Sequence, residues 1–463
     1  MHKLYYQFPN TWFGDCMPFG HGNEFFLYHQ RDTRKPGPFG EPFGWDLATT
    51  SDFVHYKDCG VAVPRGTDEE QDQFIFAGSV FEAEGQYHIF YTGYNRDYPA
   101  QGKASQVLMH AVSDDLYHWT KTQEALTFTP QDGYDPDDWR DPFVLWNEEE
   151  QVYMLILGAR KIGPKTQQTG RTVKFTSTDL KNWKFEGDFW APGLFTMHEM
   201  VDLFQIGDWW YHVVTEYSDR SKMVYRMSKS INGPWIAPSD DAFDGRAYYA
   251  GRTFCLNGQR ILFGWVPTKE NSDDHANFEW AGTFVAHEIY QREDGTLGVK
   301  IPDTVWAAFN EREKIADFTI DSPYAREEKV VARECGDLFS FEADVKFSGD
   351  PRSFGVRILE SEEKAQAYQF LFHVKENRYV FEKNPNWPWF GCMNIGLERP
   401  IDLNAGETYH IQIIFDDDIA TLYVNGVALN TRAYEKPGDS LSLFVTDGTL
   451  EVTNASIARG IKA

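Results

Sequence analysis

Apolar and aromatic residues occur along this chain in short runs, many of them alternating with polar residues, and Gly, Asp and Asn separate the runs. The spacing of three to four residues that marks an amphipathic helix is scarce. Alternation with a period of two is typical of β-strands that bury one face, and the separating residues are those that favour turns. The pattern therefore predicts an all-β protein.

One unit recurs through the first two thirds of the chain. A strand such as QYHIFYTG is followed by a second strand and then by a turn of the form Ser-x-Asp-Leu-x-x-Trp, as in 113–119 and 177–183. A spacing of about 50 to 65 residues suits the four-stranded blade of a propeller. Five units fill residues 1–305, so we predict a five-bladed β-propeller, whose axis brings together side chains from distant parts of the chain. The central strands of the units are expected at 23–30, 86–93, 151–160, 208–217 and 259–266.

The pattern of charged and apolar residues changes after residue 305. A charged stretch over 306–334 is predicted to hold a linker and the first segment of a second domain. Alternating strands over 335–463 predict an antiparallel β-sandwich, and Asn425-Gly426 between two apolar runs predicts a hairpin turn. A loop with Trp387 and Trp389 offers its rings either to a sugar or to the domain interface, and we favour the interface.

Charge and aromatic content narrow the choice of partner. The chain carries 70 Asp and Glu against 44 Lys and Arg, a formal charge of −26. Such a charge repels nucleic acid and anionic membranes and is compatible with a neutral carbohydrate. The 16% of aromatic residues suits strand cores and also the platforms on which sugar rings stack. We therefore expect a small carbohydrate substrate, no nucleic acid and no membrane; the oligomeric state stays open.

The cysteines and the N-terminal sequence bear on cofactors and location. The five cysteines are widely spaced and form no pair with metal-ligand spacing, so we expect no cofactor and no metal. The N-terminus shows no basic stretch followed by an apolar run, and no run approaches the about 18–20 apolar residues of a membrane span. These features predict a reduced, cytoplasmic protein.

Three acidic residues stand at corresponding points of different units, each ahead of a predicted central strand. Asp15 lies in TWFGDCMPF, Asp141 lies in DDWRDPFVLW, and Glu199 lies in MHEMVDLF. Each alone is an ordinary turn residue or ion-pair partner. Because equivalent positions of the blades converge on one rim of a propeller, the coincidence of three predicts a catalytic site.

Cleavage of a glycosidic bond needs such a set of groups. One carboxylate attacks the anomeric carbon or activates water, and another carboxyl protonates the leaving oxygen. The acid needs a raised pKa, whereas the nucleophile must stay ionised. A third carboxylate can hold substrate hydroxyls while positive charge develops on the sugar ring.

With these residues the chain resembles glycoside hydrolase family 32, which includes invertases, inulinases and levanases. RDP at 140–142 matches the family's motif, HEMVDLF at 198–204 is similar to its ECPDLF, and WFGDC at 12–16 is similar to the start of its WMNDPNG. FAGS at 76–79 looks like the family's FSGS, and YYA at 248–250 resembles its aromatic pair. The resemblance covers nearly the whole chain and implies a five-bladed propeller followed by a β-sandwich.

The resemblance also implies residue roles in a retaining mechanism, which passes through a covalent glycosyl-enzyme intermediate. By this resemblance Asp15 is the nucleophile, Glu199 is the general acid/base, and Asp141 is the transition-state stabiliser. Contacts to the sugar or to the catalytic groups are implied for Trp12, Gln30, Phe76, Ser79, Arg140, Asp202 and Tyr248.

Several positions beside the catalytic motifs depart from the family. Gly14 replaces the Asn before the nucleophile, Cys16-Met17-Pro18 replaces Pro-Asn-Gly, and Met200-Val201 replaces the Cys-Pro after the acid/base. These positions would contact the sugar or tune the carboxylates, so we expect altered specificity. The prediction is exo cleavage of terminal fructofuranosyl or similar units from short oligosaccharides, with sucrose a poor substrate.

Three other functions stay open at this point. An inverting arabinofuranosidase or xylosidase of the family 43 kind would also place three acidic residues on a five-bladed propeller, with its carboxyl pair about 6.5–9.5 Å apart instead of about 5–5.5 Å. A carbohydrate-binding protein without catalysis would keep the aromatic funnel, although the retention of three carboxylates argues against it. A transferase that passes the fructosyl group to a sugar would share every motif.

Overall fold

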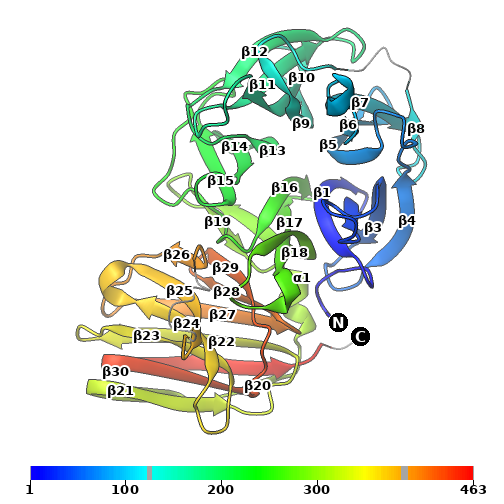
Figure 1. Ribbon diagram of the computed structural model, residues 1–463. Coiled ribbons are helices and arrows are strands. Elements are labelled where there is room, and N and C mark those ends of the chain that lie inside the picture. Colours follow the sequence, from blue (N-terminus) through cyan, green and yellow to red (C-terminus); the bar gives the residue numbers. More distant parts are fainter. Residues whose placement is uncertain (1, 123–127, 387–394, 462–463) are drawn as a thin grey trace.

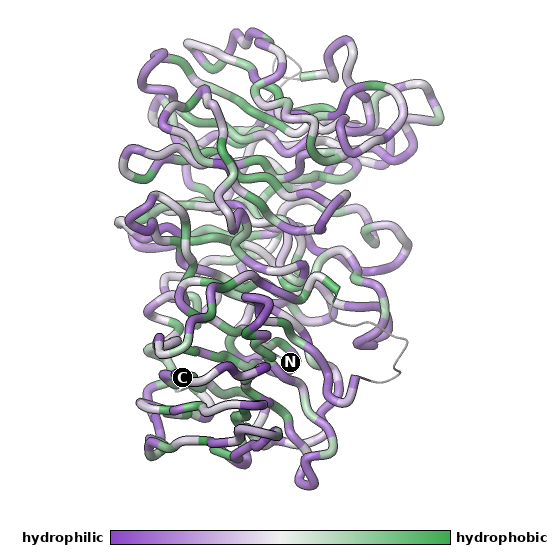
Figure 2. The backbone as a smooth tube through the Cα atoms, turned by 90° about the vertical axis from the view of Figure 1, so that its left-hand side faces the viewer, coloured by the Kyte–Doolittle hydropathy of each residue, from purple (hydrophilic) through white to green (hydrophobic). Residues whose placement is uncertain are grey.

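The computed structural model describes residues 2–122, 128–386 and 395–461, so the predicted loop with Trp387 and Trp389 lies outside the described residues. The described chain is built almost entirely of strands, arranged as a propeller followed by a sandwich (Figure 1). Hydrophobic stretches run through the middle of the strands and hydrophilic ones through the turns (Figure 2). The predicted five-bladed propeller and β-sandwich are confirmed.

Five blades surround the propeller axis, and each runs antiparallel from its innermost strand outward. The innermost strands contact one another in a closed ring and therefore line the axis. They are β1 (Trp12–His21), β5 (Phe74–Ala83), β9 (Tyr134–Asn147), β13 (Glu199–Ile206) and β16 (Tyr249–Leu256). The other strands are β2 (Glu24–Asp32), β3 (Trp45–Thr50), β4 (Lys57–Val63), β6 (Gln86–Tyr94), β7 (Gln106–Ser113), β8 (Thr120–Lys121), β10 (Val152–Lys161), β11 (Gly170–Ser177), β12 (Lys184–Trp190), β14 (Trp209–Glu216), β15 (Lys222–Ser228), β17 (Gln259–Lys269), β18 (Phe278–Gln291) and β19 (Leu297–Lys300).

The strands predicted to be central are the second strands of the blades, β2, β6, β10, β14 and β17. A second strand has a neighbour on each side and is largely buried, so it carries the longest apolar run in its blade. The innermost strands are less apolar because polar residues of the axis interrupt them. The acidic residues Asp15, Asp141 and Glu199 lie within innermost strands, each of which directly precedes the predicted central strand of its blade.

The repeated Ser-x-Asp-Leu turn has a clear structural cause. In the copy that follows β7, the Ser113 hydroxyl accepts a hydrogen bond from the backbone N–H of Leu116 at 2.9 Å. The Asp115 carboxylate accepts two more, from the backbone N–H groups of Tyr117 at 2.9 Å and His118 at 2.8 Å. Each copy of the turn thus supplies side-chain acceptors for backbone donors that no strand can pair.

The ring closes between the last blade and the first. Strand β1 pairs with β18 at Phe13 and Gly282, and the backbone of Tyr6 bridges to that of Phe284. Ahead of β1, the N-terminal segment crosses to the sandwich and ends close to the C-terminus (Figure 1). The buried Asp416 carboxylate there accepts hydrogen bonds from the backbone N–H groups of residues 3, 4 and 5.

The sandwich begins soon after the short helix α1 (Asp303–Ala308) and is held together by its last strand. This strand, β30 (Ser440–Arg459), pairs with β20, β21, β22 and β23 along its 20 residues. The Asn425-Gly426 hairpin is confirmed, since Val424 pairs with Val427 and both turn residues have positive φ, 46° and 82°. The elements are β20 (Arg312–Lys314), β21 (Phe318–Ala332), β22 (Leu338–Ser348), β23 (Ser353–Glu360), β24 (Ala367–His373), β25 (Arg378–Asn384), β26 (Glu398–Pro400), β27 (Thr408–Asp416), β28 (Ile419–Val424) and β29 (Val427–Arg432), with 3-10 turns η1 (Pro99–Gln101), η3 (Glu270–Ser272) and η4 (Val374–Glu376).

Buried polar contacts join the two domains. The Asp244 carboxylate of the propeller accepts hydrogen bonds from the backbone N–H of Asn430 at 2.8 Å and contacts the imidazole of His287 at 3.0 Å. The guanidinium of Arg432 donates to the carbonyl of Val266 at 2.9 Å. Because these groups are buried, each domain leaves polar atoms unsatisfied without the other.

Candidate active site

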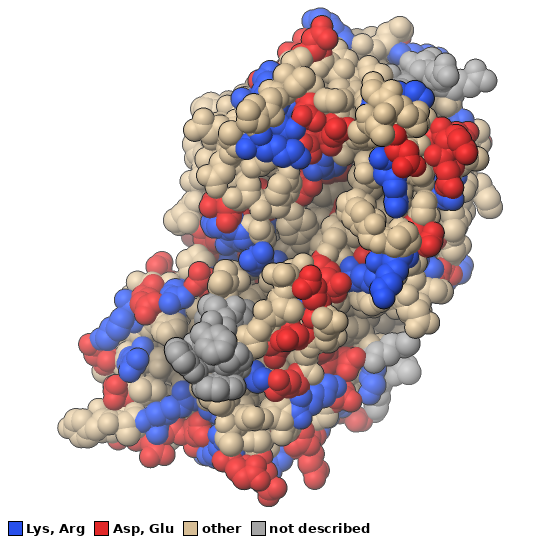
Figure 3. Space-filling view, viewed as in Figure 1, with Lys and Arg blue, Asp and Glu red and all other residues tan. Residues whose placement is uncertain are grey.

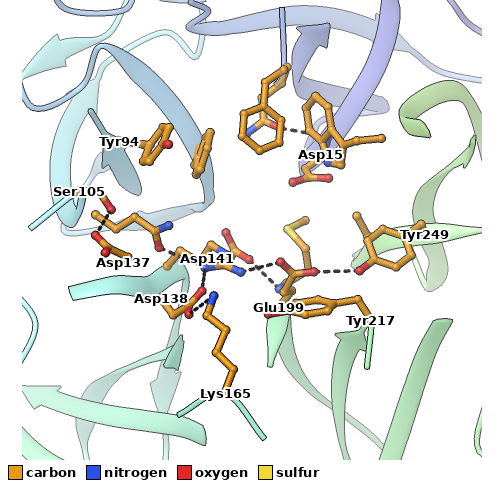
Figure 4. A pocket seen from close by; sticks show the side chains of 18 of the residues that line it. Asp15, Tyr94, Ser105, Asp137, Asp138, Asp141, Lys165, Glu199, Tyr217 and Tyr249 are labelled. Atoms are coloured by element: carbon orange, nitrogen blue, oxygen red, sulfur yellow. Dashed lines mark hydrogen bonds and ion pairs between the residues drawn. The ribbon is translucent and has the colours of Figure 1, made fainter. Parts of the chain in front are cut away.

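A cavity of about 570 Å³ opens at the propeller axis. The three acidic residues singled out from the sequence, Asp15, Asp141 and Glu199, all line it and come from three different blades (Figure 4). The surface of the molecule is hollowed here, with acidic and basic side chains around the mouth (Figure 3). The complete lining is Asp15, Gln30, Phe39, Phe76, Tyr94, Pro99, Ser105, Gln106, Asp137, Asp138, Arg140, Asp141, Lys165, Glu199, Met200, Tyr217, Tyr249, Ala250 and Trp280.

Each of the five innermost strands carries a β-bulge at the level of this cavity. The pairing register of the strand with its neighbour shifts at Phe13/Cys16, Phe76/Gly78, Arg140/Phe143, Glu199/Asp202 and Tyr249/Arg252. A bulge leaves residues unpaired and turns their side chains out of the pleat. In three blades it holds a non-glycine residue at positive φ, namely Asp141 at 61°, Met200 at 48° and Ala250 at 54°. The rim of the funnel is thus built by a repeated local distortion.

Asp15 is half-buried on the cavity wall and has few polar partners. The Trp265 indole N–H donates to its Oδ1 at 3.1 Å, and its own backbone N–H donates to Oε1 of Gln30 at 3.2 Å. Burial, followed by the negative charge of Asp141, raises the pKa of the Asp15 carboxyl well above its usual range. The carboxyl therefore needs nearby positive charge if it is to be ionised.

Glu199 has a different, strongly polar environment. Its Oε1 accepts a hydrogen bond from the Arg140 guanidinium at 2.7 Å, and its Oε2 accepts one from the Tyr249 hydroxyl at 2.9 Å. Arg140 is itself fixed by Asp138 at 3.0 Å and by Gln106 at 3.2 Å. These contacts determine the direction of both Glu199 oxygens, which a proton-transfer group requires.

Asp141 is tied into the backbone of two neighbouring blades. Its Oδ2 accepts a hydrogen bond from the backbone N–H of Met200 at 2.9 Å, and its own N–H donates to Oγ1 of Thr92 at 3.0 Å. Burial raises the pKa of the Asp141 carboxyl, and the Arg140 charge acts in the opposite direction. One carboxylate oxygen is thereby held while the other faces the cavity wall.

The residues implied as sugar contacts divide into two groups. Gln30, Phe76 and Arg140 line the cavity with the carboxylates. Trp12 is outside the lining, and its ring instead packs under the Arg34 guanidinium at 4.5 Å.

Ser79 and Asp202 lie beyond the bulges, toward the opposite end of the innermost strands, where they line a separate hollow. There they connect neighbouring blades: the Ser79 hydroxyl accepts from the Val144 N–H at 3.2 Å, and Asp202 accepts from the Thr253 N–H at 2.7 Å. Both residues follow the bulge, where the strand has already turned away from the cavity. The structure therefore offers no sugar contact for either.

Tyr248 is likewise buried away from the cavity. Its hydroxyl donates to the carbonyl of Val285 at 2.9 Å, and its neighbour Tyr249 takes the place by Glu199. In the structure, Tyr249 and Glu199 stand at the same point of the bulge in adjacent blades. Tyr94, Lys165, Tyr217 and Trp280 are further lining residues that the sequence motifs missed.

Comparison with known proteins decides the family. Residues 6–295 match the N-terminal domain of glycosyl hydrolases family 32, and residues 311–459 match the C-terminal domain of the same family. The chain belongs to family 32. This family 32 chain is accordingly a glycoside hydrolase of the retaining, β-fructofuranosidase class rather than a family 43 enzyme or a binding protein without catalysis.

Relatives of this family 32 hydrolase are similar over nearly their whole length. A sucrose-6-phosphate hydrolase of Escherichia coli is 23% identical over 439 residues, which cover 90% of this chain and 86% of the relative. A levanbiose-producing levanase of Bacillus subtilis is 23% identical over 493 residues, covering 97% and 89%. The crystal structure of fructan 1-exohydrolase IIa from Cichorium intybus has a TM-score of 0.81 at 16% identity and covers 100% of this chain and 98% of its own, so the fold is shared.

Within the described part of this family 32 hydrolase, no three His, Cys, Asp or Glu side chains are grouped so that they could hold a metal ion. Across the same residues, no helix is long and apolar enough to cross a membrane.

Proposed function

We propose that Asp15, Glu199 and Asp141 act respectively as nucleophile, general acid/base and transition-state stabiliser of a retaining β-fructofuranosidase. The observation that carries this assignment is that equivalent bulges of three blades present the three carboxylates to one cavity in different environments. Asp15 has few polar partners and faces the cavity. Glu199 has both oxygens oriented by Arg140 and Tyr249, as a group that gives and takes a proton requires.

The reaction proceeds in two displacements. An Asp15 oxygen attacks the anomeric carbon while the bond to the leaving oxygen breaks, and Glu199 gives that oxygen its proton. Water then attacks the glycosyl-enzyme and passes a proton to Glu199, which releases the Asp15 carboxylate. Asp141, held by the Met200 N–H, stabilises the positive charge that develops on the ring in both steps.

The proposed substrate is a neutral, short oligosaccharide with a terminal fructofuranosyl unit, cleaved by exo action. The lining contains five carboxylates, on Asp15, Asp137, Asp138, Asp141 and Glu199, against the two cations of Arg140 and Lys165. Both cations are already ion-paired, Lys165 with Asp138 at 3.2 Å and Arg140 with Glu199 at 2.7 Å. The net negative charge of the lining would therefore repel a phosphate group on the substrate. The proposed substrate thus differs from the phosphorylated sugar named for the Escherichia coli relative.

Aromatic rings on one side of the cavity suit the apolar face of a sugar. Phe76 lies against Tyr94 with ring centroids 4.4 Å apart, and Phe39 packs edge-on to both Phe76 and Trp280. These side chains come from the first, second and fifth blades and form an aromatic wall of the cavity, in which Figure 4 labels Tyr94. Stacking against such a wall would orient a terminal ring for attack by Asp15.

Substitution of the carboxylates tests the roles. Asp15→Asn and Glu199→Gln are each expected to lower kcat by several powers of ten, because general acid–base catalysis alone contributes about 10²–10⁴. The melting temperature of each variant should be unchanged or higher. Azide should restore turnover of the Asp15 variant and yield a glycosyl azide. A loss of less than about a hundredfold in either variant would contradict the assigned role.

A substrate panel tests specificity. We expect 1-kestose or another short neutral fructoside to be cleaved faster than sucrose, and sucrose 6-phosphate to be cleaved slowest, with retention of the anomeric configuration by NMR. Rapid cleavage of sucrose, or a preference for sucrose 6-phosphate over sucrose, would refute this specificity. Inversion on an arabinofuranoside would refute the retaining mechanism.

A further inference from the structure

Arg252 is a buried arginine that crosses the propeller axis below the active site. It stands just after the bulge of β16 and is 1% exposed. Its guanidinium reaches the bulge of β9, where it donates hydrogen bonds to the carbonyls of Asp141 at 2.8 Å and Pro142 at 3.1 Å. Arg252 therefore holds the two consecutive carbonyls that follow the Cα of Asp141, a residue with a positive φ of 61°.

Among the described residues, Arg252 forms no direct ion pair with a carboxylate. Both of its acceptors are neutral carbonyls, and within the described residues no carboxylate oxygen lies within 4.0 Å of its nitrogens. Arg140, the other arginine of the site, is ion-paired with Glu199 and Asp138. A buried charge without a paired carboxylate acts strongly on its surroundings because the local dielectric constant is low.

Arg252 does not line the catalytic cavity, so it does not touch the sugar. It lines the hollow at the opposite end of the innermost strands, together with Asp202 and Arg260. Arg252 can therefore affect the reaction only through its contacts with the Asp141 bulge and through the positive charge of its own guanidinium.

We propose that Arg252 is a positioning residue of the retaining reaction, which holds the Asp141 bulge from beneath the cavity and places a buried positive charge there. The proposal rests on the assignment of Asp15 as the nucleophile. Burial and the charges of Asp141 and Glu199 raise the pKa of Asp15, and the charge of Arg252 acts in the opposite direction as a smaller influence. Trp265 supports the ionised form only through a neutral N–H.

The groups that face Asp15 allow the effect of Arg252 to be separated from others. Acting on the Asp15 carboxyl are the Trp265 N–H and the charged groups Asp141, Glu199 and Arg252. Facing Arg252 are Asp141, Asp202, Asp15 and Cys16. Arg260 is a cation in the same hollow that interacts with Asp202 and Cys255 but faces neither Asp15 nor Asp141, so it offers a matched control.

Two substitutions separate the charge of Arg252 from its grip. Arg252→Gln removes the charge and weakens the grip, so kcat should fall about tenfold or more and the acid limb of the kcat/KM profile should move to higher pH, since a nearby positive charge lowers a carboxyl pKa. Arg252→Lys keeps the charge but not the planar fork that holds two carbonyls, so kcat should fall about tenfold with the acid limb in place. Arg260→Gln should change neither quantity.

The outcomes decide the proposal. An acid limb of Arg252→Gln that coincides with those of wild type and Arg260→Gln, with only a lower melting temperature, would show a merely structural residue. If Arg252→Gln does not fold, Arg252→Lys decides alone: a tenfold lower kcat in folded protein supports the grip, and wild-type kcat overturns it. Failure of azide rescue in Asp15→Asn would instead refute the nucleophile assignment, which is a separate measurement.

Discussion

Two adjacent tyrosines show how far a single position decides function in this site. Tyr249 donates its hydroxyl proton to Glu199, whereas Tyr248 donates to the carbonyls of Leu262 and Val285 in the blade interior. Consecutive residues of an extended chain point to opposite faces. The side chain of Tyr249 therefore contacts a catalytic residue, whereas that of Tyr248 packs inside the blade.

This contrast gives a matched pair of variants. Tyr249→Phe should lower kcat about tenfold or more with little change in melting temperature, because Glu199 loses one of its two orienting bonds. Tyr248→Phe should reduce the free energy of unfolding by about 1 kcal/mol and leave kcat within about twofold. Steady-state kinetics and thermal melts check both, and equal effects of the two variants on kcat would contradict the assignment.

The raised pKa of Asp15 has a consequence for stability. Because the folded-state pKa lies above the unfolded one, this carboxyl costs stability as pH rises through the ordinary carboxyl range, and the cost persists at neutral pH. Asp15→Asn should therefore melt above wild type at pH 7, by about 1 °C for each kcal/mol gained in a chain of this size. The difference should shrink toward pH 4, where both side chains are neutral. A lower melting temperature of the variant at pH 7 would contradict this.

At the residue scale, the sequence alone was sufficient to identify the three carboxylates that occur at corresponding places in different blades. Asp15, Asp141 and Glu199 could be picked out because each stands beside a distinctive motif at the same point of its blade. Tyr249 and Arg252 could not, because their environment depends on which residue a bulge leaves unpaired. Hydrophobic alternation does not show where that irregularity falls, so the direction of side chains near it cannot be read from the pattern.

At the scale of single strands, close backbone approach explains a glycine next to the site. Gly158 of β10 stands opposite the bulge of β9, and an added Cβ would lie 1.8 Å from the carbonyl oxygen of His198. His198 directly precedes Glu199, so only a residue without a side chain lets the third and fourth blades meet here.

Gly158→Ala should therefore disturb both stability and catalysis. The displaced carbonyl should cost about 1–3 kcal/mol of folding free energy and lower kcat/KM about tenfold or more by moving Glu199. Gly37→Ala is the control, since a Cβ there would meet no atom within 4 Å. Unchanged kinetics in Gly158→Ala would mean that the position of Glu199 does not depend on this contact.

Strands and turns were predictable where local chemistry determines them. The Asn425-Gly426 hairpin follows from the positive φ values that these two residue types tolerate, and the Ser-x-Asp-Leu turns follow from side-chain capping. The order of strands within a blade was less accessible, because the most apolar strand proved to be the second one, between two neighbours. Apolar content reports burial, not distance from the axis.

At the scale of the whole molecule, the N-terminal segment joins the two domains. The Asp416 carboxylate accepts backbone N–H groups from Lys3, Leu4 and Tyr5, all at or below 3.1 Å. Asp416→Ala should lower the free energy of unfolding by about 3 kcal/mol or more, because several buried donors lose their acceptor. Asp321→Ala, which removes one exposed carboxylate of the sandwich, should have little effect. Chemical denaturation of the two variants measures the difference, and equal stabilities would contradict the role of Asp416.

The two-domain architecture was predictable from the sequence, but the way the domains interact was not. Repeats and alternation report each domain separately, because they reflect local burial within a blade or sheet. The interface instead depends on single polar residues far apart in the chain, such as Asp244 with Asn430 and Arg399 with Asp240. No periodic signal marks such pairs.

The hydrogen bonds between residues 3–5 and Asp416 also have a consequence for the order of events during biosynthesis. Residues 3–5 precede β1, the strand that carries Asp15, yet their buried acceptor Asp416 follows most of the sandwich strands and is translated long after these residues. These backbone donors can therefore reach their acceptor only after most of the sandwich has been translated, whereas the contacts that hold the three carboxylates lie within the propeller.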